Sequence, residues 1–199
     1  MGKGENFERK VCKELSMWWT HNRDDSIFWR TSQSGGRRTQ RQKKGNRTPY
    51  SAGDVGLLNP IGAPFLDFFV VELKRGFTKT IDTLSFVDWR FKKNGPILLQ
   101  WFEKAEKERK EDGRFGVLLI FKRDRHLRCV MINKDLFVKI KKIRGTSPPT
   151  PYATITIGNS LQCFHIMLYS SFFRWMTPET VKEMLRNVKG GKRKRRITK

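Results

Sequence analysis

The chain has 199 residues, 37% of them hydrophobic and 12% aromatic, a composition that supports one domain with its own core and excludes a disordered protein. It carries 42 Lys and Arg residues against 19 Asp and Glu residues, a formal net charge of +23. This excess predicts a polyanionic partner, with nucleic acid ahead of an anionic membrane surface. The same excess of basic residues disfavours an acidic enzyme that acts on small molecules, and it disfavours an inert structural protein.

The three cysteines, Cys12, Cys129 and Cys163, include no CxxC pair. Their odd number predicts free, buried thiols in a reducing cytoplasm rather than a disulfide framework. Cys163 and His165 would share one face of a strand, but without further ligands the spacing does not indicate zinc. The N-terminal segment lacks the apolar region of a signal peptide, and no apolar run reaches the ~20 residues of a membrane span.

Apolar periodicity predicts the elements of the first half of the chain. They are a helix at Asn6–Trp19, a short strand at Ser26–Thr31, a polar loop over residues 32–51, and two strands at Val55–Leu58 and Asp67–Lys74 joined by turns as a hairpin. In the second half, the same reasoning predicts a helix at Ile97–Glu111, hairpins of Phe115–Phe121 with Leu127–Ile132 and of Tyr152–Ile157 with Leu161–Met167, and a short helix after Thr177. The order of helix, strands, helix and strands predicts an α/β fold, with a mixed central sheet flanked by helices.

Two basic segments contain no acidic residue. Gly36–Arg47 carries six basic side chains and Lys189–Lys199 carries seven. Without these 13 charges the rest of the chain is still at +10, so the body is basic too. A single basic run is often merely solvated, whereas two runs on a basic body favour contact with nucleic acid. The second run could alternatively be a nuclear localisation signal.

The acidic residues within so basic a chain are informative. Glu72 interrupts the apolar strand, where alternation places Phe69, Val71 and Leu73 on a core face and Glu72 and Lys74 together on the other face. A hairpin would bring Asp54 beside them. Two adjacent carboxylates repel each other unless a divalent cation lies between them, and oxygen ligands favour Mg²⁺ or Mn²⁺.

Glu8 is a further acidic residue in an unexpected place, because helical spacing puts it within the apolar stripe of the first helix. A carboxylate aimed at the interior requires a partner, for which a cation, its bound water or the strand lysine would serve. The alternative is structural: a salt bridge between Glu72 and Lys74, Asp54 as a turn residue, and Glu8 at a helix edge.

Four segments in order resemble the PD-(D/E)XK nuclease superfamily, and within it most closely the archaeal-type Holliday junction resolvases and their phage-encoded relatives. The segments are Gly4–Arg9 (GENFER), Arg30–Arg37 (RTSQSGGR), Gly53-Asp54 in place of the usual Pro-Asp, and Val71–Lys74 (VELK). The resemblance covers about the first 75 residues. It implies a restriction-endonuclease-like mixed β-sheet flanked by helices, with extra C-terminal hairpins and a helix.

The resemblance also implies roles for particular residues. The residues implied in catalysis are Glu8, Asp54, Glu72, Lys74 and Ser34. The cation, Mg²⁺ or Mn²⁺, would be held by Glu8, Asp54, Glu72 and the Leu73 carbonyl. The residues implied in DNA contact are Arg30, Ser32, Ser34, Arg37, Arg38, Arg41, Lys43, Lys44 and Arg47. Such resolvases act as symmetric dimers, so a homodimer follows by analogy.

The resulting hypothesis is a Mg²⁺-dependent endodeoxyribonuclease that cuts four-way junctions or other branched DNA, in the cytoplasm, or in the host cytoplasm if it is encoded by a phage. The alternatives are a related restriction, nicking or DNA-processing nuclease and a non-catalytic nucleic-acid-binding protein. A single nuclease domain is expected over residues 1–188, with the catalytic motifs in 4–76 and the basic loop in 36–47. Residues 189–199 are expected to form a disordered basic tail.

Overall fold

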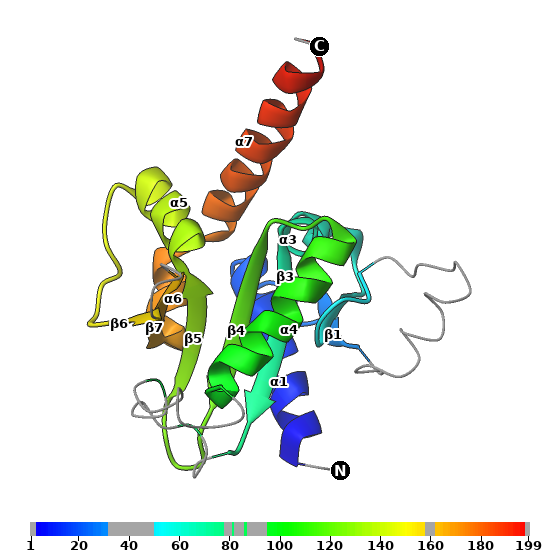
Figure 1. Ribbon diagram of the computed structural model, residues 1–199. Helices are drawn as coiled ribbons and strands as arrows, with labels where there is room; N and C mark the ends of the chain where they lie inside the picture. Colours follow the sequence, from blue (N-terminus) through cyan, green and yellow to red (C-terminus); the bar gives the residue numbers. More distant parts are fainter. Residues whose placement is uncertain are drawn as a thin grey trace.

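The computed structural model describes residues 3–31, 50–77, 81, 86, 95–157 and 162–197, and within these ranges the side chains of residues 4–190. The helices are α1 (Lys3–Trp19), α3 (Ala63–Phe68), α4 (Ile97–Asp112), α5 (Lys134–Arg144), α6 (Tyr169–Trp175) and α7 (Pro178–Ile197), together with the 3₁₀ helix η1 (Pro60–Gly62) (Figure 1). The strands are β1 (Phe28–Arg30), β2 (Val55–Leu57), β3 (Phe69–Arg75), β4 (Gly116–Lys122), β5 (Arg128–Asn133), β6 (Ala153–Ile157) and β7 (Gln162–Leu168).

The predicted mixed central sheet is confirmed. Its five strands have the order β3-β4-β5-β7-β6, in which β3 and β4 run parallel and the remaining neighbours are antiparallel. Both predicted C-terminal hairpins, β4–β5 and β6–β7, belong to this sheet. The parallel β3–β4 pair needs a crossover, and α4 provides it. Together with the flanking helices, this arrangement is consistent with the restriction-endonuclease-like fold.

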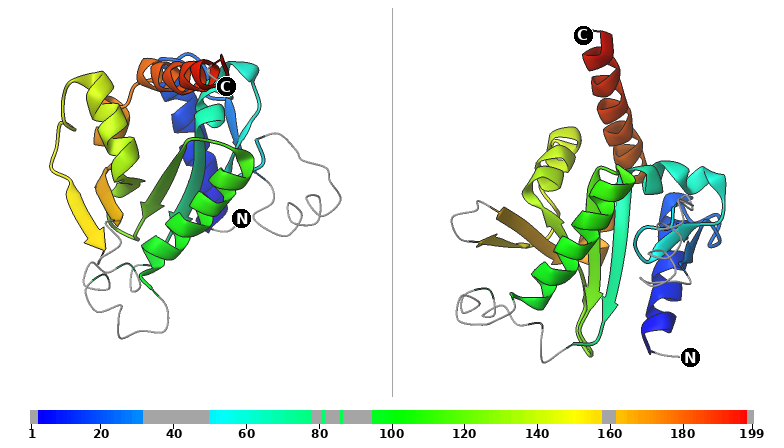
Figure 2. Two further views of the ribbon diagram at one scale, coloured as in Figure 1. Left: turned by 45° about the horizontal axis from the view of Figure 1, so that its top comes forward. Right: turned by 45° about the vertical axis from the view of Figure 1, so that its right-hand side comes forward.

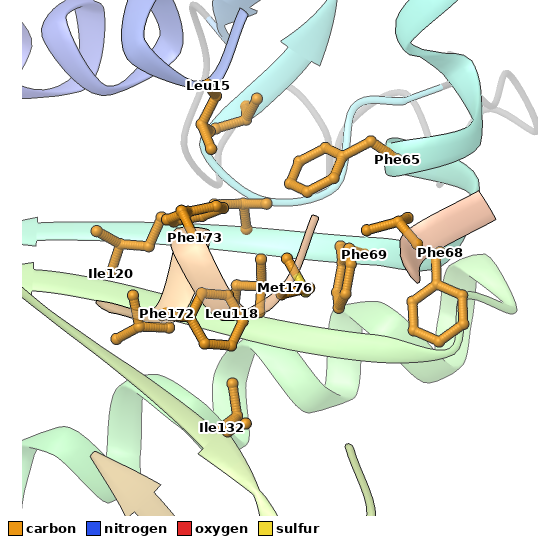
Figure 3. Packing of buried hydrophobic residues seen from close by; sticks show 14 of the residues in the cluster. Leu15, Phe65, Phe68, Phe69, Leu118, Ile120, Ile132, Phe172, Phe173 and Met176 are labelled. Carbon is orange, nitrogen blue, oxygen red and sulfur yellow. The ribbon is translucent and has the colours of Figure 1, made fainter. Parts of the chain in front are cut away.

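Helices cover both faces of the sheet at β3 (Figure 2). The residues Phe69, Val71 and Leu73 face a large core shared with α1, α6 and α7, part of which is shown in Figure 3. Val70 faces a second core beneath α4. Because β3 is packed on both sides, a charged residue in it needs partners, and Glu72 and Lys74 project toward the α4 side, as the alternation predicted.

The predicted hairpin between the second and third strands is wrong. Strand β2 pairs antiparallel with β1 in a separate two-stranded sheet, and the segment predicted as turns forms η1 and α3 instead. The side chain of Asn59 caps η1 by accepting a hydrogen bond from the Ile61 amide, and prolines stand at the first turns of both helices, where their missing N–H groups cost nothing.

Two further helices, α5 and α6, were also not predicted. The last helix is longer than expected, since α7 continues to Ile197 and projects from the body (Figure 1). Its last residues therefore belong to the basic segment 189–199, whose disorder stays a prediction. No helix in the described part of the chain is long and apolar enough to span a bilayer. All three cysteines are free, but the prediction of buried thiols holds only for Cys12.

Candidate active site

Glu72 and Lys74 meet as an ion pair on β3. Lys74 Nζ lies 2.6 Å from Glu72 Oε1 and 3.5 Å from Asp54 Oδ2, and it also donates to the Leu73 carbonyl at 3.3 Å. The side chains of Glu72 and Asp54 are 1% and 8% exposed, respectively. The structure therefore brings together three of the predicted site residues and the predicted backbone carbonyl in one largely buried cluster.

Asp54 reaches this cluster through backbone contacts rather than a hairpin. Its amide donates to the Val71 carbonyl at 2.8 Å, and the Leu73 amide donates to Asp54 Oδ2 at 2.8 Å. The residue before it, Gly53, has φ +75°, and a Cβ there would lie 2.4 Å from the Val71 carbonyl oxygen. Only glycine fits such a position, so Gly53 fixes how closely Asp54 approaches β3.

Burial and mutual repulsion set the charge states of the cluster. Burial, and next the charge of Glu72, raise the pKa of Asp54 from 3.8 to about 6. Burial acts to lower the pKa of Lys74, but the charges of Asp54 and Glu72 outweigh it and raise that pKa above 10.5. Near neutral pH the site thus holds an ionised but destabilised carboxylate beside a lysine that stays protonated.

The cluster fits a divalent cation. Among the described residues, Glu72 Oε2 is buried without a hydrogen-bond partner, although a buried carboxylate oxygen ordinarily has one. Asp54, Glu72 and the Leu73 carbonyl form an all-oxygen donor set, which suits Mg²⁺ or Mn²⁺. No three acidic, His or Cys side chains form a cation site by themselves in the part of the chain that the structure describes, so backbone oxygen or water would have to complete the ligand shell.

Glu8 lies near this cluster, but its contact is with Arg30. Arg30 Nε is 3.2 Å from Glu8 Oε2, and Arg30 Nη1 is 2.9 Å from Glu5 Oε1. Burial raises the pKa of Glu8 more than Arg30 lowers it, and the charges of Lys74 and Glu72 also act on it. The structure thus links the α1 acids to β1 through Arg30, a partner that the sequence did not predict.

Two residues of α4 complete the surroundings of the cluster, and neither was predicted. Lys104 Nζ lies 3.2 Å from Glu72 Oε1. Glu108 Oε2 accepts a hydrogen bond from the Gly53 amide at 2.9 Å, which ties the turn before Asp54 to α4. The predicted helix at Ile97–Glu111 was the available signal, but periodicity does not show which strand residue a helix side chain will meet.

Most of the predicted DNA-contacting residues lie outside the described residues. They are Ser32, Ser34, Arg37, Arg38, Arg41, Lys43, Lys44 and Arg47. Of that set, Arg30 is described, and its guanidinium is occupied by Glu5 and Glu8.

Residues 1–184 match the family described as "Phage putative PDDEXK endonuclease". The chain belongs to this PD-(D/E)XK endonuclease family. No curated protein and no solved structure matches it. The letters of the family name denote its motif: proline and aspartate, followed later in the chain by an acidic residue, any residue and lysine. The aspartate of this motif corresponds here to Asp54, and the second part corresponds to Glu72-Leu73-Lys74.

The endonuclease departs from the motif at Gly53, where the name has proline. A proline is locked near φ −65°, whereas Gly53 has φ +75°. The tight turn against Val71 therefore requires glycine in place of proline at position 53, and Asp54 still reaches β3.

Proposed function

We propose that this endonuclease is a Mg²⁺-dependent, structure-selective enzyme that hydrolyses phosphodiester bonds in branched DNA and resolves four-way junctions. The observation that carries the proposal is the cluster of Asp54, Glu72, the Leu73 carbonyl and Lys74, in which one buried carboxylate oxygen of Glu72 has no hydrogen-bond partner among the described residues. A binding protein without catalysis has no use for two buried acids that repel each other, because they weaken both its stability and its attraction for DNA.

Asp54, Glu72 and the Leu73 carbonyl would hold the cation. A divalent cation in this donor set supplies Lewis acidity to the phosphate and makes a water molecule more acidic. Lys74 stabilises the negative charge that develops on the phosphate or orients the attacking water. Its raised pKa keeps it protonated near neutral pH, which favours this electrostatic role over that of a general base.

The remaining residues are assigned to support and DNA contact. Glu8, which interacts with Arg30 and feels the charges of Glu72 and Lys74, would act at the edge of the cation site. Ser34 would contact the phosphate beside the scissile bond, and the basic loop 36–47 would hold the DNA backbone. Two opposing strands of a junction must be cut, which requires two active sites, so we propose a homodimer.

The choice of branched DNA is tested by a panel of labelled substrates of matched sequence: a four-way junction, a flap, a linear duplex and a single strand, each with Mg²⁺ or with EDTA. Paired symmetric nicks in the junction, dependent on Mg²⁺, are expected. Equal cleavage of the linear duplex would contradict junction resolution and favour a restriction or nicking nuclease. Tight binding of every substrate without cleavage would favour a binding protein.

A further inference from the structure

Lys104 contacts the same carboxylate oxygen as the motif lysine. Its Nζ lies 3.2 Å from Glu72 Oε1, and Lys74 Nζ lies 2.6 Å from that oxygen. Glu72 Oε2 has no hydrogen-bond partner among the described residues. Two ammonium groups therefore contact Glu72 Oε1, although like charges at such short range repel each other. Neither of them contacts Glu72 Oε2.

The two lysines are held very differently. Lys74 has Asp54 and the Leu73 carbonyl as further partners, and its side chain is 21% exposed. Lys104 comes from the neighbouring helix α4, its side chain is 48% exposed, and its second carboxylate neighbour, Glu108, lies 4.0 Å away. Since exposed ion pairs are weak and a lysine side chain is long and flexible, Lys104 is the one that can leave.

The charge balance favours its departure when a cation binds. With Asp54 ionised, the four groups Asp54, Glu72, Lys74 and Lys104 sum to zero. A divalent cation on the two carboxylates makes the sum +2. The cation then repels the Lys104 ammonium, while the enlarged positive charge attracts a phosphate.

Building on the proposed function, we propose that Lys104 changes partners during the reaction. Its ammonium holds Glu72 while the site is free of metal, and it moves to a phosphate of the bound DNA when a divalent cation occupies Glu72. Lys104 thus competes with the cation for Glu72 before the cation binds. Once the cation is bound, Lys104 is a second lysine that contacts the DNA substrate.

The test measures cation affinity and cleavage separately. MnCl₂ is titrated calorimetrically into the metal-free full-length protein, using the wild type, Lys104→Met, Lys104→Arg and the control Lys107→Met, which alters an exposed lysine of the same helix. Single-turnover cleavage of the substrate that the wild type cuts best is then measured at saturating Mn²⁺. Thermal unfolding in EDTA verifies that each variant is folded.

Lys104→Met is expected to bind Mn²⁺ up to about fivefold more tightly than the wild type, since a partly exposed competing ion pair is lost, and yet to cleave about tenfold or more slowly. Lys104→Arg should retain the wild-type Mn²⁺ affinity because it keeps the charge, and Lys107→Met should match the wild type in both assays.

Three results would overturn the proposal: unchanged or weaker Mn²⁺ binding by Lys104→Met, tighter Mn²⁺ binding by Lys104→Arg, or full cleavage by Lys104→Met. If the wild type still binds Mn²⁺ and cleaves DNA in that case, the proposed function is unaffected. A wild type that neither binds Mn²⁺ nor cleaves DNA would overturn the proposed function, and the exchange of partners with it.

Discussion

Replacing the buried aspartate by its neutral isostere is expected to make the metal-free protein more stable. The pKa of Asp54 is raised from 3.8 to about 6, because of burial first and the charge of Glu72 second. A tenfold change in proton affinity corresponds to about 1.4 kcal/mol, so the ionised carboxylate costs about 3 kcal/mol at pH 7. Asp54→Asn removes this cost and can still accept the hydrogen bond from the Leu73 amide. The side-chain N–H group of the new asparagine needs a hydrogen-bond partner, and this requirement offsets about 1 kcal/mol of the gain in stability.

The expected gain is therefore about 1–3 kcal/mol at pH 7, or about 2–12 °C in the midpoint of thermal unfolding for a chain of this size. The sign follows from proton binding. Between pH 4 and 6 the folded wild type holds a proton that the unfolded chain has released, so its stability falls as pH rises through this window. Below pH 3.8 the carboxyl group is protonated in both states, and the advantage of Asp54→Asn should vanish.

Unfolding by heat or urea in EDTA, at intervals from pH 3 to pH 8, measures this difference. The same preparation should have lost DNA cleavage while retaining DNA binding. A variant that is less stable than the wild type at pH 7, or equally destabilised at every pH, would contradict this expectation, because Asp54 would then be a structural residue whose charge the fold needs.

Three further outcomes follow from the same geometry. Glu72→Gln should reduce cleavage by at least about a hundredfold and leave DNA binding intact, as measured by single-turnover kinetics and fluorescence anisotropy; loss of binding and of fold together would show that Glu72 is structural. Gly53→Ala should destabilise the protein by several kcal/mol in urea unfolding, because its Cβ would lie 2.4 Å from the Val71 carbonyl oxygen at φ +75°; unchanged stability would contradict the tight turn. Cleavage should fall below about pH 6 as Asp54 gains a proton, and the midpoint should move to lower pH as Mg²⁺ is increased, since cation and proton compete; a midpoint independent of Mg²⁺ would remove Asp54 from the cation site.

The sequence predicted the regular elements whose apolar pattern repeats clearly. The stripe of α1 and the alternation in β3 both correspond to buried faces in the structure. It missed α3, because its six residues are too few for a helical period and prolines and glycine suggested turns. Helix α5 was missed although Asn133 caps it and Gly145 ends it, since its many lysines dilute the apolar stripe.

The candidate site was predictable where its residues are close along the chain. Glu72 and Lys74 share one face of a strand, so two-residue alternation places them together. Asp54 was correctly placed beside them but for the wrong reason, since the turn at Gly53 and backbone contacts bring it there rather than a hairpin.

Lys104 and Glu108 could not be predicted as part of the site. They come from α4, and the packing of that helix on β3 depends on the tertiary fold rather than on local pattern. Arg30 is similar: the family resemblance implied contact with DNA, whereas its contacts with Glu5 and Glu8 depend on how α1 packs on β1.

We propose that Asp54, Glu72 and the Leu73 carbonyl form the cation site of the endonuclease. Anomalous scattering from a crystal of the wild-type protein soaked with Mn²⁺ tests it most directly, because it locates the ion and its ligands. We expect a peak bonded to both carboxylates, with the Lys104 ammonium withdrawn from Glu72. A peak bound elsewhere, in crystals of a protein whose cleavage requires Mn²⁺, would contradict it.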